Sequence, residues 1–135
     1  YRKDTGTKIT LHHLLTHRSG IPNYTSLPGV WSDSLRTPYT TRQLAQKFCS
    51  GDLQFEPGSQ YQYNNSGYFL LAAIAERVTG KSFAALSNEL IFSRFGLTEI
   101  GVADREIVLP QRASGYAYTI GQVRHAANMH MANLN

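Results

Sequence analysis

Cysteine is almost absent from this sequence. Cys49 is the only one among 135 residues, so no disulfide can form within the chain. It closes a segment that is predicted to be helical, where a lone cysteine is expected to act as a small buried hydrophobe rather than as a nucleophile. The sequence also lacks any apolar run of about 20 residues, the length that a membrane-spanning helix needs.

Charge is sparse as well. Only 16% of the residues are Asp, Glu, Lys or Arg, and the net charge is +4. The basic residues are scattered singly, whereas nucleic-acid binding favours a basic patch or stripe. A nucleic-acid partner is therefore not expected. A basic binding domain stays a third reading of the chain, which salt-dependent binding to a polyanion would support.

The length and the apolar content of 41% are those of one globular domain, and no internal repeat is found. The sequence opens on Tyr1 without an initiating Met, and we interpret it as an excised piece of a longer protein. Residues 1–135 are accordingly expected to form a single, partial domain.

Four helices are predicted from capping residues and apolar spacing. The predicted N-caps are Thr10 for the first helix, Thr40 or Thr41 for the second and Ser82 for the fourth, and the third helix is predicted to run from about Ser66 to Thr79. Gly80 should end the third helix, which is apolar enough over residues 68–78 to be buried nearly all round. In the fourth helix, Phe83, Leu86, Leu90 and Ile91 are expected to face inward.

The remaining segments carry weaker signals. Residues 23–39 have no sustained period and predict a long surface loop. Residues 100–109 look irregular, residues 113–118 short and extended, and residues 122–135 compatible with a helix.

The stretch at residues 55–83 carries the central predicted helix and the candidate site. A Pro-Gly turn leads into a short alternating segment, then a polar elbow, Asn-Asn-Ser-Gly, and then the apolar helix. This order places the phenol of Tyr63 and the amide of Asn65 two residues apart at the mouth of a helix. Polar groups held by a core helix are typical of a functional site. Taken alone, the same residues also fit an Asn-rich helix cap beside a stacked tyrosine.

Two blocks of sequence favour the site. Phe-x-Pro-Gly, Tyr-x-Tyr-Asn-Asn-x-Gly-Tyr and Val-Thr-Gly-Lys-Ser-Phe (within residues 55–83) resemble the central motif region of the serine β-lactamase and penicillin-binding-protein-like family, which includes carboxypeptidases and esterases. Leu-Leu-Thr-His-Arg-Ser-Gly-Ile-Pro (residues 14–22) resembles the segment that precedes this region in the family. The resemblance covers roughly residues 7–116, and the family's Tyr-x-Asn motif falls on Tyr63, Asn64 and Asn65, with Asn64 in the variable position.

The resemblance implies a fold and a chemistry. The chain would be a mostly α fragment, the helical lobe of the α/β β-lactamase/transpeptidase-like fold, with the sheet largely absent. Tyr63 would be catalytic, moving a proton to or from a serine nucleophile, and Asn65 would bind substrate through an amide that can both donate and accept. The parent protein would hydrolyse amide, lactam or ester carbonyls through an acyl-serine intermediate.

The family's other two motifs are absent from the sequence. No Ser is followed by Lys three residues later, and neither Lys-Ser/Thr-Gly nor His-x-Gly occurs after Asn65. The chain alone is therefore expected to be inactive, with the nucleophile and the strand motif supplied by segments outside it. The alternative is a non-catalytic relative that binds peptidoglycan or another partner.

His13 and His17 lie four residues apart on a predicted helix, a spacing that can hold a metal, but no third ligand is evident. We therefore expect structural histidines, with His17 holding the loop after its helix, and Arg18, Ser19 and Tyr24 near the cleft. No metal and no organic cofactor is implied. The expected partner is a small-molecule or peptidoglycan-like substrate, and the resemblance implies a periplasmic, extracellular or membrane-anchored location.

Overall fold

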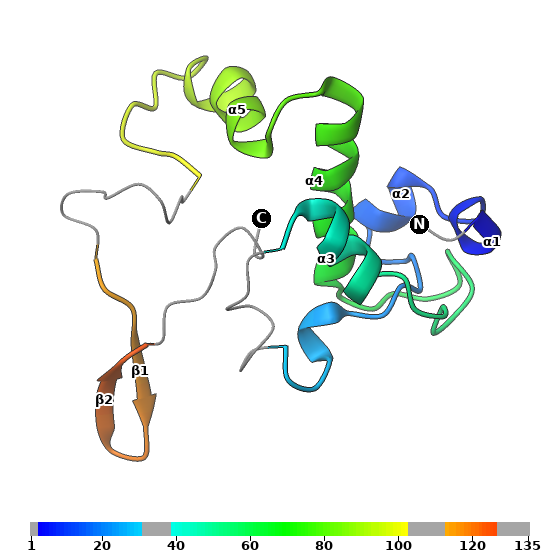
Figure 1. Ribbon diagram of the computed structural model, residues 1–135, viewed down its shortest axis with the longest axis horizontal. Coiled ribbons are helices and arrows are strands. Elements are labelled where there is room, and N and C mark those ends of the chain that lie inside the picture. The colour runs from blue at the N-terminus through cyan, green and yellow to red at the C-terminus, as the bar shows by residue number, and fades with distance from the viewer. Residues whose placement is uncertain (1–2, 31–38, 103–112, 127–135) are drawn as a thin grey trace.

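The computed structural model describes residues 3–30, 39–102 and 113–126. The helical elements are α1 (Lys3–Gly6), α2 (Leu11–Leu15), the 3₁₀ turn η1 (Tyr24–Ser26), α3 (Thr41–Phe48), α4 (Asn65–Thr79), α5 (Phe83–Ser87) and the π-helical turn η3 (Asn88–Phe92). The two strands are β1 (Tyr116–Thr119) and β2 (Gln122–His125). Helix α4 stands at the centre, with α2, α3 and η1 packed against it and α5 across its far end (Figure 1).

The helices begin where the sequence predicts. Thr10 and Thr40 each accept a hydrogen bond from the backbone N–H of the third residue of their helix, and the side chain of that third residue accepts one from the N–H of the cap residue. Ser82 caps α5 by accepting from the N–H of Ala85. Gly80 ends α4 in the left-handed conformation, at φ 69°, which glycine adopts without steric cost. The predicted helix starts are thus confirmed.

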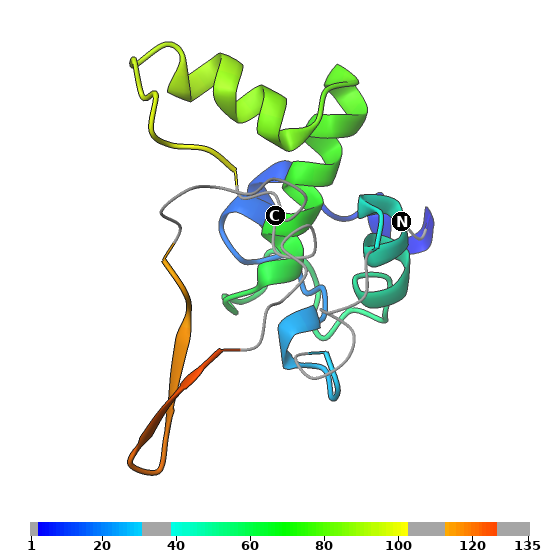
Figure 2. The ribbon, with the colours of Figure 1, turned by 60° about the vertical axis from the view of Figure 1, so that its left-hand side comes forward.

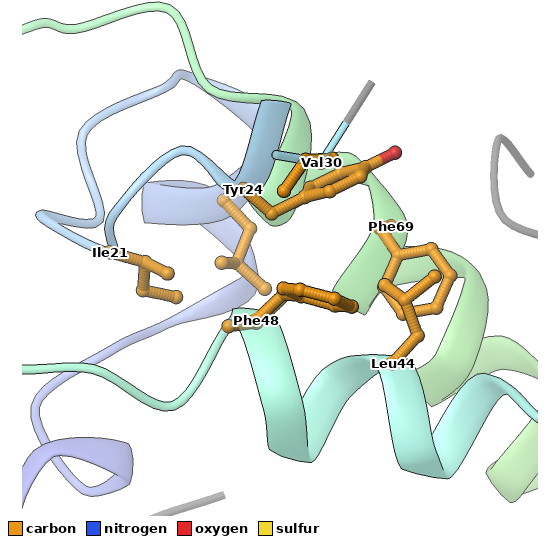
Figure 3. Packing of buried hydrophobic residues seen from close by; sticks show 8 residues of the cluster. Ile21, Tyr24, Val30, Leu44, Phe48 and Phe69 are labelled. Carbon is orange, nitrogen blue, oxygen red and sulfur yellow. The ribbon is translucent and has the colours of Figure 1, made fainter. Parts of the chain in front are cut away.

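The core lies where α3, η1 and the first half of α4 meet (Figure 3). Leu44 and Phe48 from α3 face Phe69 from α4, and Tyr24 contacts Phe69 edge to face with ring centroids 6.2 Å apart. Tyr24 and Val30 are both buried. The prediction of a surface loop over residues 23–39 is therefore wrong for these two residues, because a lone aromatic or valine in a polar segment gives no period to read; residues 31–38 lie outside the described part.

The prediction that α4 is buried nearly all round is wrong for this chain. Within α4 only Ser66, Gly67 and Phe69 are buried, while Tyr68, Ile74 and Val78 are exposed. Leu90 and Ile91, predicted to face inward, are about half exposed as well, whereas Leu86 is buried. The apolar pattern marks faces for which no described element of this chain provides a cover.

The described sheet consists of one hairpin. Strands β1 and β2 pair antiparallel, with Tyr116 opposite His125 and Tyr118 opposite Val123. The turn residues Ile120 and Gly121 both have positive φ, as a two-residue hairpin turn of this type requires. The hairpin projects away from the helices in both ribbon views (Figures 1 and 2).

The hairpin confirms the extended segment predicted near residue 116. It shows that the compatibility of residues 122–135 with a helix was wrong for residues 122–125, because a short polar segment is fixed by its pairing partner rather than by its own propensity. Residues 127–135 and 103–112 lie outside the described part, while residues 100–102 are irregular as predicted. None of the described helices has the length and apolarity needed to cross a bilayer.

Candidate active site

Tyr63 and Asn65 meet at the start of α4. The hydroxyl of Tyr63 donates a hydrogen bond to Oδ1 of Asn65 at 3.0 Å, and the Tyr63 side chain is 60% exposed. Asn65 is the first residue of α4, so its side chain emerges at the N-terminal end of the helix. The structure therefore brings together the two residues that the sequence predicts as the site, with the phenol open to solvent.

A second layer of polar side chains orients the Asn65 amide. Its Nδ2 donates to Oγ1 of Thr25 at 2.9 Å, and its backbone N–H donates to Oδ1 of Asn23 at 3.1 Å. Thr25 in turn donates to Asn23 Oδ1 at 3.1 Å. With Nδ2 turned to Thr25, Oδ1 points to Tyr63. Asn23 and Thr25 were not predicted as supporting residues. Their position directly after the Gly-Ile-Pro block is the one sequence signal for such a role.

Asn64, the variable residue of the motif, has a structural role here. Its buried side chain caps α4 by accepting from the N–H of Gly67 at 3.1 Å, and its Nδ2 donates to the carbonyl of Ile21. The cap fixes the angle at which the chain enters the helix. It therefore fixes the placement of Tyr63 and Asn65, which lie on either side of it.

The two histidines do not share a helix face. Helix α2 ends at Leu15, and His17 follows it in the left-handed conformation at φ 56°. His13 uses Nδ1 to accept from the N–H of Thr10 at 3.3 Å, whereas His17 uses Nδ1 to accept from the N–H of Asn64 at 3.2 Å. The prediction that both lie at i and i+4 of one helix is therefore wrong. Among residues 3–30, 39–102 and 113–126, no three His, Cys, Asp or Glu side chains converge as metal ligands would.

Arg18 and Ser19 were expected near the cleft, but their side chains form hydrogen bonds with backbone groups instead. The Arg18 guanidinium donates to the carbonyl of Gly58 at 2.6 and 3.2 Å, and the N–H of Gly58 donates back to the Arg18 carbonyl at 2.8 Å. Ser19 is buried and accepts from the N–H of Ile21. These bonds tie the Pro-Gly turn to the His-Arg-Ser-Gly segment, so the two sequence blocks lie side by side.

A groove of about 460 Å³ runs along α4 from Asn65. Its walls are mostly apolar and are formed by Tyr24, Asn65, Tyr68, Phe69, Leu71, Ala72, Ala75 and Phe83. Tyr24 thus reaches the cleft as expected, through its ring. Burial raises the pKa of the Tyr24 phenol above its usual value, with a further contribution from the charge of Cys49. Tyr24 is therefore held neutral near physiological pH, whereas Tyr63 is an exposed phenol whose hydroxyl contacts Asn65 in the groove wall.

Comparison with known proteins places the chain in a family. Residues 1–133 match the Beta-lactamase family. The chain belongs to that family. Penicillin-binding protein 4* of Bacillus subtilis is 35% identical over 113 residues, which cover 82% of this chain and 24% of that protein. Esterase EstB of Burkholderia gladioli is 33% identical over 107 residues, 73% of this chain and 27% of the esterase. The chain thus spans about a quarter of the length of these curated relatives.

Solved structures of similar proteins confirm the fold. A penicillin binding protein from Bacillus halodurans superposes with a TM-score of 0.75 at 27% identity, over 90% of this chain and 40% of that protein. The D-amino acid amidase of Ochrobactrum anthropi SV3 gives a TM-score of 0.67 at 29% identity, over 83% of this chain and 32% of the amidase. This Beta-lactamase family chain is therefore the mostly α part of a β-lactamase/transpeptidase-like fold, as the sequence resemblance predicts.

Proposed function

We propose that this chain carries the Tyr-x-Asn part of the active site of a serine hydrolase, which acts on amide, lactam or ester carbonyls through an acyl-serine intermediate. The observation that carries the proposal is the pairing of an exposed phenol, Tyr63, with the amide of Asn65 at 3.0 Å. Membership of the Beta-lactamase family supports it. So does the groove that opens at Asn65, because catalytic groups are usually found at the edge of such a hollow.

In this proposal Tyr63 moves the proton. The serine oxygen attacks the carbonyl carbon while its proton passes to the Tyr63 oxygen. As the C–N or C–O bond breaks, Tyr63 passes this proton on to the leaving nitrogen or oxygen. Water then adds to the acyl-serine and releases the acid. A lysine ammonium beside the phenol would favour the anionic form of the phenol and so assist the first transfer.

Asn65 positions the substrate in the same proposal. One N–H of its Nδ2 points to Thr25 and its Oδ1 holds the Tyr63 hydroxyl. An amide nitrogen carries a second N–H, which borders the groove and can donate to the carbonyl of a bound substrate. The hydrogen bonds to Asn23 and Thr25 hold this donor in one orientation, which favours preorganised binding.

The nucleophile and the strand motif are proposed to come from other segments of the polypeptide, because neither Ser-x-x-Lys nor a Lys-Ser/Thr-Gly or His-x-Gly motif after Asn65 occurs among the 135 residues. Residues 1–135 would then be a single, partial domain. The short share of the relatives' length that the chain spans supports this view. The substrate would be a small molecule or a peptidoglycan-like peptide, and the location periplasmic, extracellular or membrane-anchored.

The test uses the product of the complete reading frame. A fluorescent penicillin and a fluorophosphonate should label one serine that belongs to a Ser-x-x-Lys motif. Tyr63→Phe keeps the ring and removes the transferable proton, so the acylation rate should fall by about 10² to 10⁴-fold, the usual contribution of general acid–base catalysis. A matched control is Tyr61→Phe, which removes an exposed phenol two residues away.

Two results would overturn the proposal. One is Tyr63→Phe acylating at the wild-type rate with every lactam and ester tried. The other is a complete protein that no probe labels but that binds D-Ala-terminated peptides, with Tyr63 and Asn65 as contacts. The second result would establish the non-catalytic binding module instead.

A further inference from the structure

His17 holds the chain on both sides of Tyr63. Its carbonyl oxygen accepts from the N–H of Gln62 at 2.9 Å, and its Nδ1 accepts from the N–H of Asn64 at 3.2 Å. The residue before Tyr63 and the residue after it are therefore bound to a single residue 46 positions earlier in the chain. His17 makes both bonds from the left-handed conformation, at φ 56°.

The imidazole also supports the Tyr63 ring directly. The His17 and Tyr63 ring centroids are 4.7 Å apart, and His17 also stacks on Tyr68 at 4.8 Å with an interplanar angle of 28°. The Tyr68 hydroxyl donates to the carbonyl of Leu15 at 3.1 Å, which anchors the stack to the end of α2. The Tyr63 ring is therefore in contact with His17, which is itself stacked on Tyr68.

We propose that His17 is a positioning residue for Tyr63 and that it fulfils this role only as the neutral imidazole. This inference rests on the proposed function of Tyr63. Because Nδ1 accepts the Asn64 N–H, it carries a lone pair, and the ring proton sits on Nε2. Uptake of a second proton places an N–H on Nδ1, opposite the N–H of Asn64, so the bond is lost.

The described side chains around the imidazole carry no charge that would replace the effect of a second proton on His17. Within the described part of the chain, the titratable side chains that face His17 are the phenols of Tyr61, Tyr63 and Tyr68. The neighbouring Arg18 directs its guanidinium to the carbonyl of Gly58. No carboxylate is recorded against the ring among the described residues. Acidification should therefore release the Tyr63 segment and lower the acylation rate.

Two substitutions of His17 test the contribution of its aromatic ring and the contribution of its hydrogen-bond acceptor independently. His17→Asn keeps an acceptor, Oδ1, close to the place of Nδ1, and asparagine tolerates the left-handed conformation. It does not titrate. His17→Phe keeps a ring but leaves the Asn64 N–H without its acceptor. In the complete protein at neutral pH, the Phe variant should acylate up to about 10²-fold more slowly than the wild type, the scale of a small misplacement of a reacting group.

The pH profile distinguishes positioning from general damage. The acylation rate of the wild type should fall at acidic pH, and His17→Asn should lose that acid limb while retaining more activity than His17→Phe at neutral pH. His13→Asn is the matched control, because His13 also accepts a backbone N–H through Nδ1 but does so at the start of α2. It should keep the acid limb. An unchanged acid limb in His17→Asn, or wild-type acylation by His17→Phe, would overturn the proposal.

A spectroscopic measurement keeps this test independent of catalysis. In the complete protein with ¹⁵N-labelled histidine and asparagine, Nδ1 of His17 should be unprotonated at neutral pH. Its protonation on acidification should coincide with a shift and faster exchange of the Asn64 amide. An Asn64 amide that does not respond to this titration refutes the role of His17. A normal response in a protein that never acylates refutes the proposed function and leaves the contact of His17 with the segment intact.

Discussion

Ser66 accepts a hydrogen bond from the backbone N–H of Tyr24 at 2.9 Å, across 42 residues of sequence. The same hydroxyl donates to the carbonyl of Pro22 at 2.7 Å, and Ser66 is fully buried. One side chain in the first turn of α4 thus fixes the segment that carries Asn23 and Thr25. These two residues orient the Asn65 amide, so Ser66 supports the site without touching it.

Ser66→Ala should lower the free energy of unfolding by about 1 to 3 kcal/mol, because it removes a buried acceptor and a buried donor whose partners stay in place. The shift of the urea midpoint measures the loss, and faster exchange of the Tyr24 amide locates it. Ser114→Ala, at an exposed position, is the control. Equal midpoints for the two variants would show that the Ser66 bonds do not stabilise the fold.

Two glycines with nearly the same backbone conformation should differ in their tolerance of alanine. Gly20 has φ 76° and Gly80 has φ 69°, so at either position alanine pays about 1 to 2 kcal/mol for the left-handed conformation. A Cβ at Gly20 would also lie 2.1 Å from the Phe55 carbonyl oxygen, whereas a Cβ at Gly80 meets nothing within 4 Å. Gly20→Ala should therefore be clearly less stable than Gly80→Ala in thermal unfolding. Equal losses would contradict the close approach of the two sequence blocks.

The sequence predicts the local parts of this fold well. Thr10, Thr40 and Ser82 cap their helices as predicted, and Gly80 ends α4. Such signals act between residues three or four apart, so they can be read without knowing the tertiary structure. The pairing of Tyr63 with Asn65 is also local, and the family motif pointed to it.

The parts that the sequence did not predict depend on distant contacts. The role of His17 follows from its bonds to Gln62 and Asn64, and no spacing within residues 9–22 encodes them. His17 was predicted to be a structural residue that holds the loop after its helix. It is structural, but the residues that it binds through its carbonyl oxygen and its ring are Gln62 and Asn64. The exposure of Val78 and Leu90 was missed for a related reason: an apolar pattern indicates which face wants burial but not which segment covers it.

Cys49 should make stability depend on pH in the alkaline range. Burial raises the pKa of its thiol from 9.0 to about 11, although a hydrogen bond with Ser66 acts in the opposite direction. The folded state holds the proton more tightly, so the stabilisation is fully present below pH 9 and is lost as the pH rises to about 11. Urea midpoints measured against pH should fall in this range. Cys49→Ala should reduce the fall, leaving the part due to Tyr24, whose pKa is also raised. An identical slope in Cys49→Ala would contradict the assignment.

The 135-residue chain on its own should bind a hydrophobic dye and unfold over a broad range of denaturant. Val78 is 78% exposed and Phe95 is 74% exposed. Apolar surface of this kind is typical of a face that is covered by another element of the fold or by a partner. Val78→Lys should reduce dye fluorescence without loss of helix signal in circular dichroism. A sharp cooperative transition of the monomer with no dye binding would show that the chain needs no further cover.

Tyr63 and Asn65 should act as one unit in the complete protein. Tyr63→Phe removes the proton that the phenol transfers, whereas Asn65→Ala removes both the acceptor for that phenol and the bond to Thr25. Asn65→Ala should therefore cause a smaller loss of acylation rate than Tyr63→Phe, together with a shift of the pH profile. Thr25→Val tests the same geometry in a milder way. It keeps the shape of the side chain and removes the oxygen that accepts from Nδ2, so it should weaken substrate binding more than it slows acylation at saturation.

Because Tyr63→Phe and Asn65→Ala act on the same proton transfer, the double variant should lose less acylation rate than the sum of the two single losses. Full additivity of Tyr63→Phe and Asn65→Ala would mean that the 3.0 Å bond between the two residues has no part in the chemistry, and that they serve separate functions at the mouth of the groove.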